Sequence, residues 1–317
     1  MTDDFDELDV PEEKASIEDE WNKIQEQMAN GTFKPKPPQW HTVESPYQPG
    51  KVRISRERYD AIMFDDEPCP VCNGTGKIQV VQQWGETESR RTVAETCPVD
   101  YRMKAKLACI KRLLPMRYQR SSLYTLKPSS NSKMSMEHQA KIIQHLRDNP
   151  NRGFFFYGEP GTSKTTFATA LVRYALERDW DRHVVAGYGN FNPVSWIHYL
   201  NWDTYIQSLL DWQNHPDTAE EPDLTPSNIR KWKQKGYTPC VVIEEIDKSR
   251  LTEFKANKLF DLVCAMDEAK SQLIMTTNYA TKEDFQAWLC QADTRLAGEA
   301  TWRRILDNCK IVNCKEK

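Results

Sequence analysis

Residues 158–165, Gly-Glu-Pro-Gly-Thr-Ser-Lys-Thr, constrain what this chain can fold into more than any other part of the sequence. The run matches a phosphate-binding loop, which joins a strand to a helix, at every position but one. The apolar run 153–157 before it predicts a buried strand, and the pattern of 165–177 after it predicts a helix. We therefore expect an α/β fold with a parallel central sheet.

Each residue type in this loop has a chemical reason to be there. Gly158 and Gly161 let the backbone turn so that successive N–H groups point at phosphate oxygens, and the helix N-terminus adds the positive end of its dipole. Lys164 would reach the β- and γ-phosphates, and the Thr165 hydroxyl would bind Mg²⁺. The predicted ATP-binding residues are Gly158, Glu159, Pro160, Gly161, Thr162, Ser163, Lys164, Thr165 and, from a later strand, Glu244.

Ser163 is the position that departs from the pattern, which has Gly before the Lys. A Ser fits there at little cost if the residue keeps a right-handed backbone, so we expect nucleotide binding to survive. The alternative is a chance Gly-rich turn between a strand and a helix.

Two adjacent acids, Glu244 and Glu245, follow a second apolar run that predicts a strand over 240–246. In such a pair the first acid holds the metal and the second acts as general base on the attacking water. Glu244 stands where Asp is expected, and its extra methylene would shift the Mg²⁺ geometry. Together with Ser163 it predicts weak ATPase activity. The alternative is that both acids only face solvent.

Three further runs predict strands at 194–200, 273–277 and 310–312, with helical stretches between them. Asn278 follows the strand 273–277 and could orient water between the second acid and the γ-phosphate. Strands that alternate with helices indicate a parallel sheet covered on both faces.

The Cys residues cluster before this region. Cys69-Pro-Val-Cys72 has the spacing of a zinc knuckle, and Cys97-Pro-Val-Asp100 repeats it with Asp in the last place. Three thiolates and one carboxylate can complete a tetrahedral Zn²⁺ site, with Cys109 as the alternative fourth ligand. A complete shell would make the zinc structural. The alternative is unliganded Cys in a small loop.

Together these residues resemble the AAA+ ATPases of the DnaC/IstB group, the bacterial helicase loaders and their transposition-helper relatives. The matching segments are 158–165, 241–247 (Val-Val-Ile-Glu-Glu-Ile-Asp) and 275–278 (Met-Thr-Thr-Asn). The resemblance covers roughly 119–317 and implies an AAA+ ATPase domain without the helical lid that many AAA+ proteins have. The Cys-containing segment similarly resembles the zinc-binding amino-terminal region of some helicase loaders.

Residues 302–306, Trp-Arg-Arg-Ile-Leu, resemble the family segment whose Arg completes the neighbouring subunit's site. By this resemblance Arg304 takes that role, with Arg303 and Arg295 as fallbacks, although Arg303 replaces the family's Ser. An Arg that acts in a neighbour's site implies head-to-tail assembly into a ring or helical filament.

The chain divides by composition into an acidic and Pro-rich arm (1–50), a zinc-binding unit with a basic linker (51–118) and the ATPase domain (119–317). An amphipathic helix at about 16–30 interrupts the arm. Residues 1–20 hold ten acids and one base, whereas 101–120 hold seven bases and no acid. The chain begins with no secretory pattern and has no apolar run near the roughly 20 residues that span a membrane. We therefore expect a cytoplasmic protein with nine free or metal-bound Cys and no membrane partner.

The resemblance implies a helicase loader that binds single-stranded DNA and a hexameric replicative helicase during DNA replication. One alternative is a transposition helper that assembles on duplex DNA and recruits a transposase. Another, of a different class, is an ATP-gated scaffold with little hydrolysis. The zinc unit favours the loader.

Overall fold

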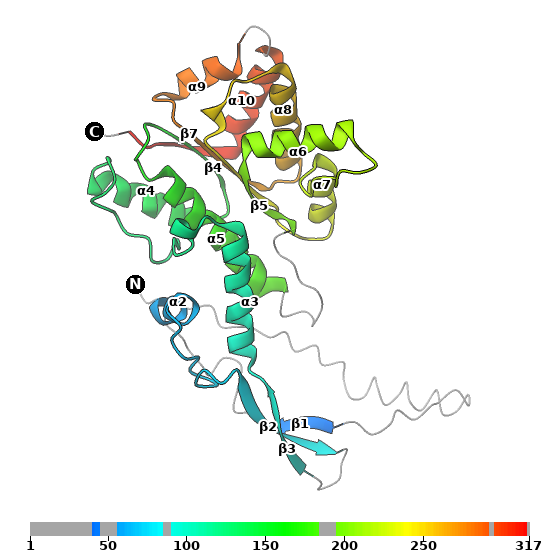
Figure 1. Ribbon diagram of the computed structural model, residues 1–317. Helices are drawn as coiled ribbons and strands as arrows, with labels where there is room; N and C mark the ends of the chain where they lie inside the picture. Colours follow the sequence, from blue (N-terminus) through cyan, green and yellow to red (C-terminus); the bar gives the residue numbers. More distant parts are fainter. Residues whose placement is uncertain (1–39, 45–55, 85–89, 184–194, 292–294, 316–317) are drawn as a thin grey trace, which may run out of the picture. The chain divides into compact units, whose positions relative to one another are not determined.

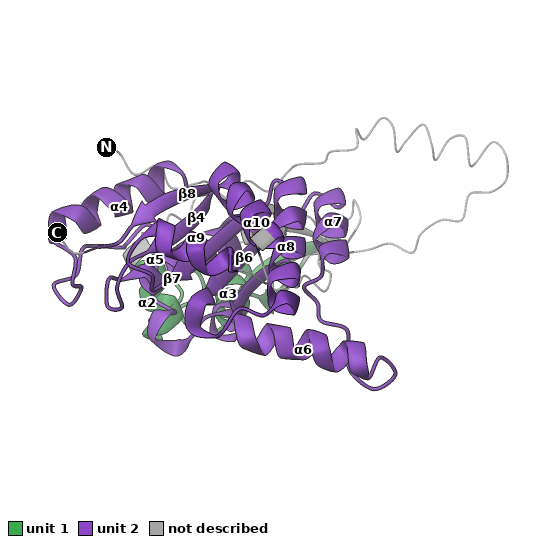
Figure 2. Cartoon of the chain, turned by 90° about the horizontal axis from the view of Figure 1, so that it is seen from above, with its two compact units in different colours: residues 1–107, 184–187 green, residues 108–183, 188–317 purple. Residues whose placement is uncertain are grey.

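The computed structural model describes residues 40–44, 56–84, 90–183, 195–291 and 295–315 (Figure 1). The chain divides into unit 1, residues 1–107 with 184–187, and unit 2, residues 108–183 with 188–317 (Figure 2). The division falls inside helix α3 (Pro98–Leu113). The helix expected at about 16–30 lies outside the described residues.

Unit 1 contains a three-stranded antiparallel sheet in the order β1-β2-β3. Its strands are β1 (Trp40–Glu44), β2 (Lys77–Trp84) and β3 (Arg90–Thr96), and helix α2 (Arg56–Phe64) lies between β1 and β2 in the sequence. Strand β1 belongs to the stretch expected to be an unstructured arm. Only Trp40 and Val43 of its five residues are apolar, so no alternating pattern reveals the strand.

Unit 2 is built on a five-stranded parallel sheet in the order β5-β6-β7-β4-β8. The expected α/β fold with a parallel sheet is therefore confirmed. Each strand predicted in this region is present, with bounds that differ by at most three residues and that agree fully for β4. The strands are β4 (Gly153–Tyr157), β5 (Ile197–Asn201), β6 (Cys240–Glu244), β7 (Gln272–Thr277) and β8 (Cys309–Asn313).

Alternate residues of β4 point to opposite faces of this sheet, as the pleat requires. Phe156 contacts Phe167 of α5 (Lys164–His183), with ring centroids 6.0 Å apart. Phe155 points the other way and contacts Phe285 and Trp302, at 4.7 and 5.6 Å. Helices therefore cover both faces, with α5 on one and α8 (Glu253–Glu268) and α10 (Arg295–Asn308) on the other (Figure 1). This double cover explains why the central strands are continuous apolar runs.

The remaining helices of unit 2 begin at side-chain caps, where Ser135, Asn201, Thr225 and Thr281 each accept a hydrogen bond from a backbone N–H of the first turn. These helices are α4 (Met136–Asp148), α6 (Trp202–Asn214), α7 (Pro226–Gln234) and α9 (Lys282–Leu289), and the short 3-10 helices are η1 (Met116–Tyr118) and η4 (Ile246–Lys248).

No helix follows β8 in the last described residues, 314–315. Within the part of the chain that the structure describes, no helix has both the length and the apolar character needed to cross a bilayer. Because all five strands are parallel, their carboxyl ends share one edge, where α/β proteins bind ligands.

Candidate functional site

The loop 158–165 lies at the carboxyl end of β4 and leads directly into α5. Gly158 has a φ of 139°, and a Cβ there would come within 2.8 Å of the carbonyl carbon and oxygen of Cys314. Gly161 has a φ of 88°, and its carbonyl accepts a hydrogen bond from the Lys133 backbone N–H at 3.1 Å. The end of β8 and the segment before α4 therefore fix the loop from two sides.

Lys164 is buried within this loop. Its Nζ donates to the carbonyl oxygens of Gly158, at 2.7 Å, and Glu159, at 2.8 Å. Burial lowers the pKa of Lys164, and the negative groups around the loop, such as Asp247 and Glu245, act in the opposite direction. The ammonium thus lies among oxygen acceptors at the point where the loop would receive phosphate.

Ser163 does not have the right-handed backbone on which its low cost depended. Its φ is 61°, in the left-handed region that Gly adopts freely and that a residue with a Cβ adopts at a cost. The loop therefore has the left-handed backbone that the Gly of the motif would adopt without strain, and Ser163 adopts it at a cost.

Glu244 is the last residue of β6, and its side chain contacts the loop 158–165. One carboxylate oxygen, Oε1, accepts a hydrogen bond from the Thr165 hydroxyl, and the other, Oε2, accepts one from the Tyr199 hydroxyl. A hydroxyl and a carboxylate side by side form the kind of oxygen donor set that Mg²⁺ prefers, so these residues fit the metal expected there.

Tyr199 was not among the residues predicted from sequence. It lies on β5, the neighbour of β6, and no motif surrounds it. Burial, and then the hydrogen bond to Glu244, raise the pKa of Tyr199 far above its ordinary value, so its hydroxyl remains a donor. Only the order of the strands brings it to the acid.

Glu245 follows at the turn out of the sheet with a left-handed backbone, φ 46°. Its N–H donates to the Thr276 hydroxyl on β7 at 2.9 Å, and its carboxylate pairs with Lys248 at 3.3 Å. Non-Gly residues in this conformation gather at functional sites, where the surroundings hold them in place. Asn278 lies at the end of β7, and its backbone N–H donates to Asp247 at 3.1 Å. The ends of the adjacent strands β6 and β7 thus bring these acids and Asn278 to the same edge.

Arg304 lies on α10 and forms an ion pair with Asp267 of α8, at 2.8 Å from Nη1 to Oδ2. The Arg304 side chain is 38% exposed. Burial acts to raise the pKa of Asp267, but hydrogen bonds from Lys270, Asn308 and Arg304 outweigh it and lower the pKa. Arg303 is exposed, and the side chain of Arg295 is outside the described residues.

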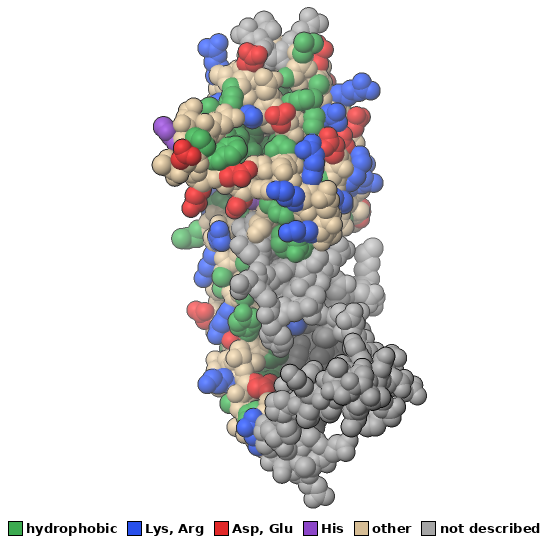
Figure 3. Space-filling view, turned by 90° about the vertical axis from the view of Figure 1, so that its right-hand side faces the viewer, with side chains coloured by type: hydrophobic (Ala, Val, Ile, Leu, Met, Phe, Trp, Pro, Cys, Tyr) green, Lys and Arg blue, Asp and Glu red, His purple; other side chains and the backbone are tan. Residues whose placement is uncertain are grey.

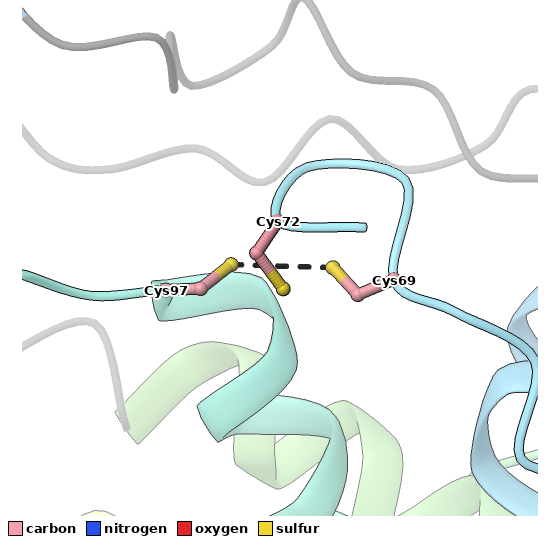
Figure 4. A group of neighbouring side chains, drawn as sticks. All are labelled: Cys69, Cys72 and Cys97. Atoms are coloured by element: carbon pink, nitrogen blue, oxygen red, sulfur yellow. Dashed lines mark hydrogen bonds between the residues drawn. The ribbon is translucent and has the colours of Figure 1, made fainter. Parts of the chain in front are cut away.

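The three thiols of the predicted zinc site lie together in unit 1 (Figure 4). Cys69 and Cys72 come from one loop, and Cys97 lies just before α3, where its N–H donates to the Gly76 carbonyl at 2.9 Å. All three sulfur atoms are within 4.8 Å of one another, and those of Cys69 and Cys97 are 3.9 Å apart. Ligands about 2.3 Å from a tetrahedral zinc would be about 3.8 Å apart, so the cluster has suitable dimensions for the ion.

The two fourth-ligand candidates lie outside that group of thiols. Asp100 is in the first turn of α3, close to Gly76, and its carboxylate pairs with Lys104 at 2.8 Å. Cys109 lies nine residues further along the same helix than Asp100, which at 1.5 Å per residue is about 14 Å. Asp100 is therefore the nearer candidate.

The chain is similar to several solved structures. The DnaC helicase loader aligns at 16% identity with a TM-score of 0.41, over 63% of this chain and 99% of that one. DnaI aligns at 11% identity with a TM-score of 0.43, over 63% of this chain and 94% of that one. AMPPCP-bound DnaA from Aquifex aeolicus aligns at 14% identity with a TM-score of 0.40, over 63% of this chain and half of that one. No protein-family model and no curated protein matches the sequence.

Proposed function

We propose that this chain is an AAA+ ATPase that uses ATP to control its assembly on a DNA-bound partner. The observation that carries the proposal is the contact of Thr165 with Glu244, which joins the phosphate-binding loop to the end of the acid strand. These two side chains would hold Mg²⁺, which when bound supplies charge neutralisation at the phosphates.

The chain's own residues then divide the work. Lys164 would exchange its loop carbonyls for phosphate oxygens, and the loop N–H groups would bind the rest of the phosphate chain. Glu245 would accept the proton of the attacking water, and Asn278 would orient that water.

The direct test is ATP turnover of the wild type against Lys164→Ala, with Lys141→Ala as a matched control. Lys141 lies on α4 and pairs with Glu137, and both side chains are exposed. We expect Lys164→Ala to abolish turnover and Lys141→Ala to retain it. Equal activity of the two variants would contradict the proposal. Binding of ATP without turnover in the wild type would instead favour the ATP-gated scaffold.

We further propose that Arg304 acts in the site of a neighbouring subunit, by head-to-tail assembly. Mixing two inactive variants, Lys164→Ala and Arg304→Ala, should restore part of the turnover, because some interfaces then combine an intact loop with an intact Arg. Asp267→Asn is the control, since it removes the ion pair within the chain but keeps Arg304. If Asp267→Asn is as inactive as Arg304→Ala and mixing restores nothing, Arg304 is structural.

Single-stranded DNA is the proposed polymer partner, in keeping with a helicase loader. Three exposed lysines lie on and just after α7: Lys231, Lys233 and Lys235. Figure 3 faces the side on which α6 and α7 lie and shows Lys and Arg side chains there, with acids between them. Neighbouring Arg230 is engaged with Glu268, at 2.8 Å. Exposed ammonium groups suit a phosphate backbone.

Replacement of these three lysines by Ala should weaken DNA binding and flatten its salt dependence. For single strands the slope of log K against log salt should fall by about 0.7 for each lost phosphate contact. Three exposed lysines elsewhere provide the matched control: Lys141, Lys270 and Lys282. Stimulation of turnover by duplex DNA alone would favour the transposition helper over the loader.

The Cys cluster is proposed to hold a structural Zn²⁺ in the cytoplasm, with Asp100 as the fourth ligand and the replicative helicase as the partner of unit 1. Metal analysis should find about one zinc per chain. Cys72→Ser and treatment with a chelator should each remove the metal and lower the melting temperature, because metal binding is coupled to folding in small sites. A Cys72→Ser chain with full zinc content would contradict the site.

A further inference from the structure

Tyr199 reaches the acid of the nucleotide site from the strand at the edge of the sheet. β5 is the outermost strand and pairs in parallel with β6, with Tyr199 opposite Val242. Its side chain extends along the sheet to Glu244, two residues further on, and its hydroxyl donates to Oε2 of that carboxylate. Because Thr165 donates to Oε1, each oxygen of Glu244 has one hydroxyl donor, and the two donors come from different elements.

The longer side chain of Glu244 explains why such a second contact matters. A Glu has one more rotatable bond than the Asp expected at the end of this strand, so its carboxylate has more positions available. A hydrogen bond from β5 on one oxygen and one from α5 on the other leaves a single arrangement of the group. This arrangement keeps Oε1 against Thr165, the other predicted metal-binding residue.

We infer that Tyr199 is a positioning residue of the metal site: by holding Oε2 of Glu244, it keeps Oε1 beside Thr165 and available to Mg²⁺. The inference rests on the proposed ATP and Mg²⁺ binding of this loop. Tyr199 itself would touch neither the nucleotide nor the metal. It would act through Glu244, as residues that hydrogen-bond to a metal ligand generally do.

The experiment is a titration of ATP binding with Mg²⁺, measured by calorimetry on the full chain and without reference to turnover. Tyr199→Phe removes one oxygen and retains the ring, so the fold is kept. We expect the Mg²⁺ concentration at which the enhancement of ATP binding is half-maximal to rise about 10- to 100-fold. This is the usual consequence of removing a hydrogen-bond partner of a metal ligand. ATP binding in the presence of a chelator should stay unchanged.

The matched control is Tyr205→Phe. Tyr205 is a buried residue of α6 whose hydroxyl donates to the Leu224 carbonyl at 3.0 Å, so this variant also loses one buried hydrogen bond. It should leave the Mg²⁺ dependence of ATP binding as in the wild type. If both variants shift that dependence equally, the effect is structural and the inference is overturned.

A second background separates positioning from general destabilisation. Glu244→Asp shortens the carboxylate away from Tyr199, so adding Tyr199→Phe to it should change the Mg²⁺ dependence less than twofold. Full additivity of the two changes would overturn the inference. If the wild type binds ATP in a Mg²⁺-dependent way and Tyr199→Phe behaves identically, the inference about Tyr199 is overturned and the proposed function is not. A wild type with no Mg²⁺-dependent ATP binding would overturn the proposed function as well.

Discussion

Ser163→Gly should make the protein more stable, although it places a flexible residue at the start of a helix. The φ of Ser163 is 61°, and a residue with a Cβ in this region costs about 1–2 kcal/mol. Gly removes this cost, but it also gives the unfolded chain more freedom, an opposing term of about 0.4–1 kcal/mol. We expect the free energy of unfolding to increase by about 0.5–1 kcal/mol. For a unit of 150–250 residues, the size range of unit 2, this corresponds to a melting temperature higher by about 1–4 °C.

The assay is thermal and urea unfolding of the full chain, with Ser163→Ala as the matched control. Ala also removes the hydroxyl, but it keeps the Cβ and therefore the strain, so it should not stabilise the protein. If Ser163→Gly and Ser163→Ala change the stability equally, the gain does not come from the backbone. If Ser163→Gly lowers the melting temperature, the left-handed conformation is not strained and the reasoning fails.

Two further predictions concern the same edge of the sheet. Lys248→Ala should raise ATP turnover by up to about fivefold, because it frees Glu245 from an exposed ion pair worth about 0.2–1 kcal/mol. Unchanged or slower turnover in a steady-state assay would count against Glu245 as the general base. Gly158→Ala should lower the free energy of unfolding by about 1–3 kcal/mol in urea titrations, since its Cβ would come within 2.8 Å of the Cys314 carbonyl. Gly236 also has a positive φ, 83° against the 139° of Gly158, but no atom lies within 4 Å of its added Cβ. Gly236→Ala should therefore cost less, and equal losses would exclude the contact as the cause.

The local features of this protein could be predicted from sequence because each depends on neighbours along the chain. The loop 158–165 matches a motif whose spacing itself fixes the chemistry, and the structure places it between β4 and α5 as expected. The spacing of Cys69 and Cys72, with a second Cys-Pro-Val turn at Cys97, predicted a cluster whose sulfur atoms do converge. Continuous apolar runs predicted the central strands β4, β6 and β7, because strands buried on both faces have no polar side.

Four widely spaced Trp residues of unit 2, at positions 196, 202, 212 and 232, are open to two interpretations from sequence, stacking on nucleic-acid bases or packing in the core. Trp196 and Trp202 are 4% and 3% exposed and pack within unit 2, so they are not available to stack on nucleic-acid bases. Widely spaced aromatic residues usually pack in a core, and these two do.

Contacts between distant segments were decided only by the tertiary structure. Nothing in the sequence places Tyr199 beside Glu244, because periodicity reports which residues are buried and not which strands become neighbours. Arg304 was predicted from its segment, whereas its ion pair with Asp267 depends on how α10 packs on α8. The φ of Ser163 likewise follows from the loop around it, since a motif specifies residue types and only the folded backbone specifies the conformation that each must adopt.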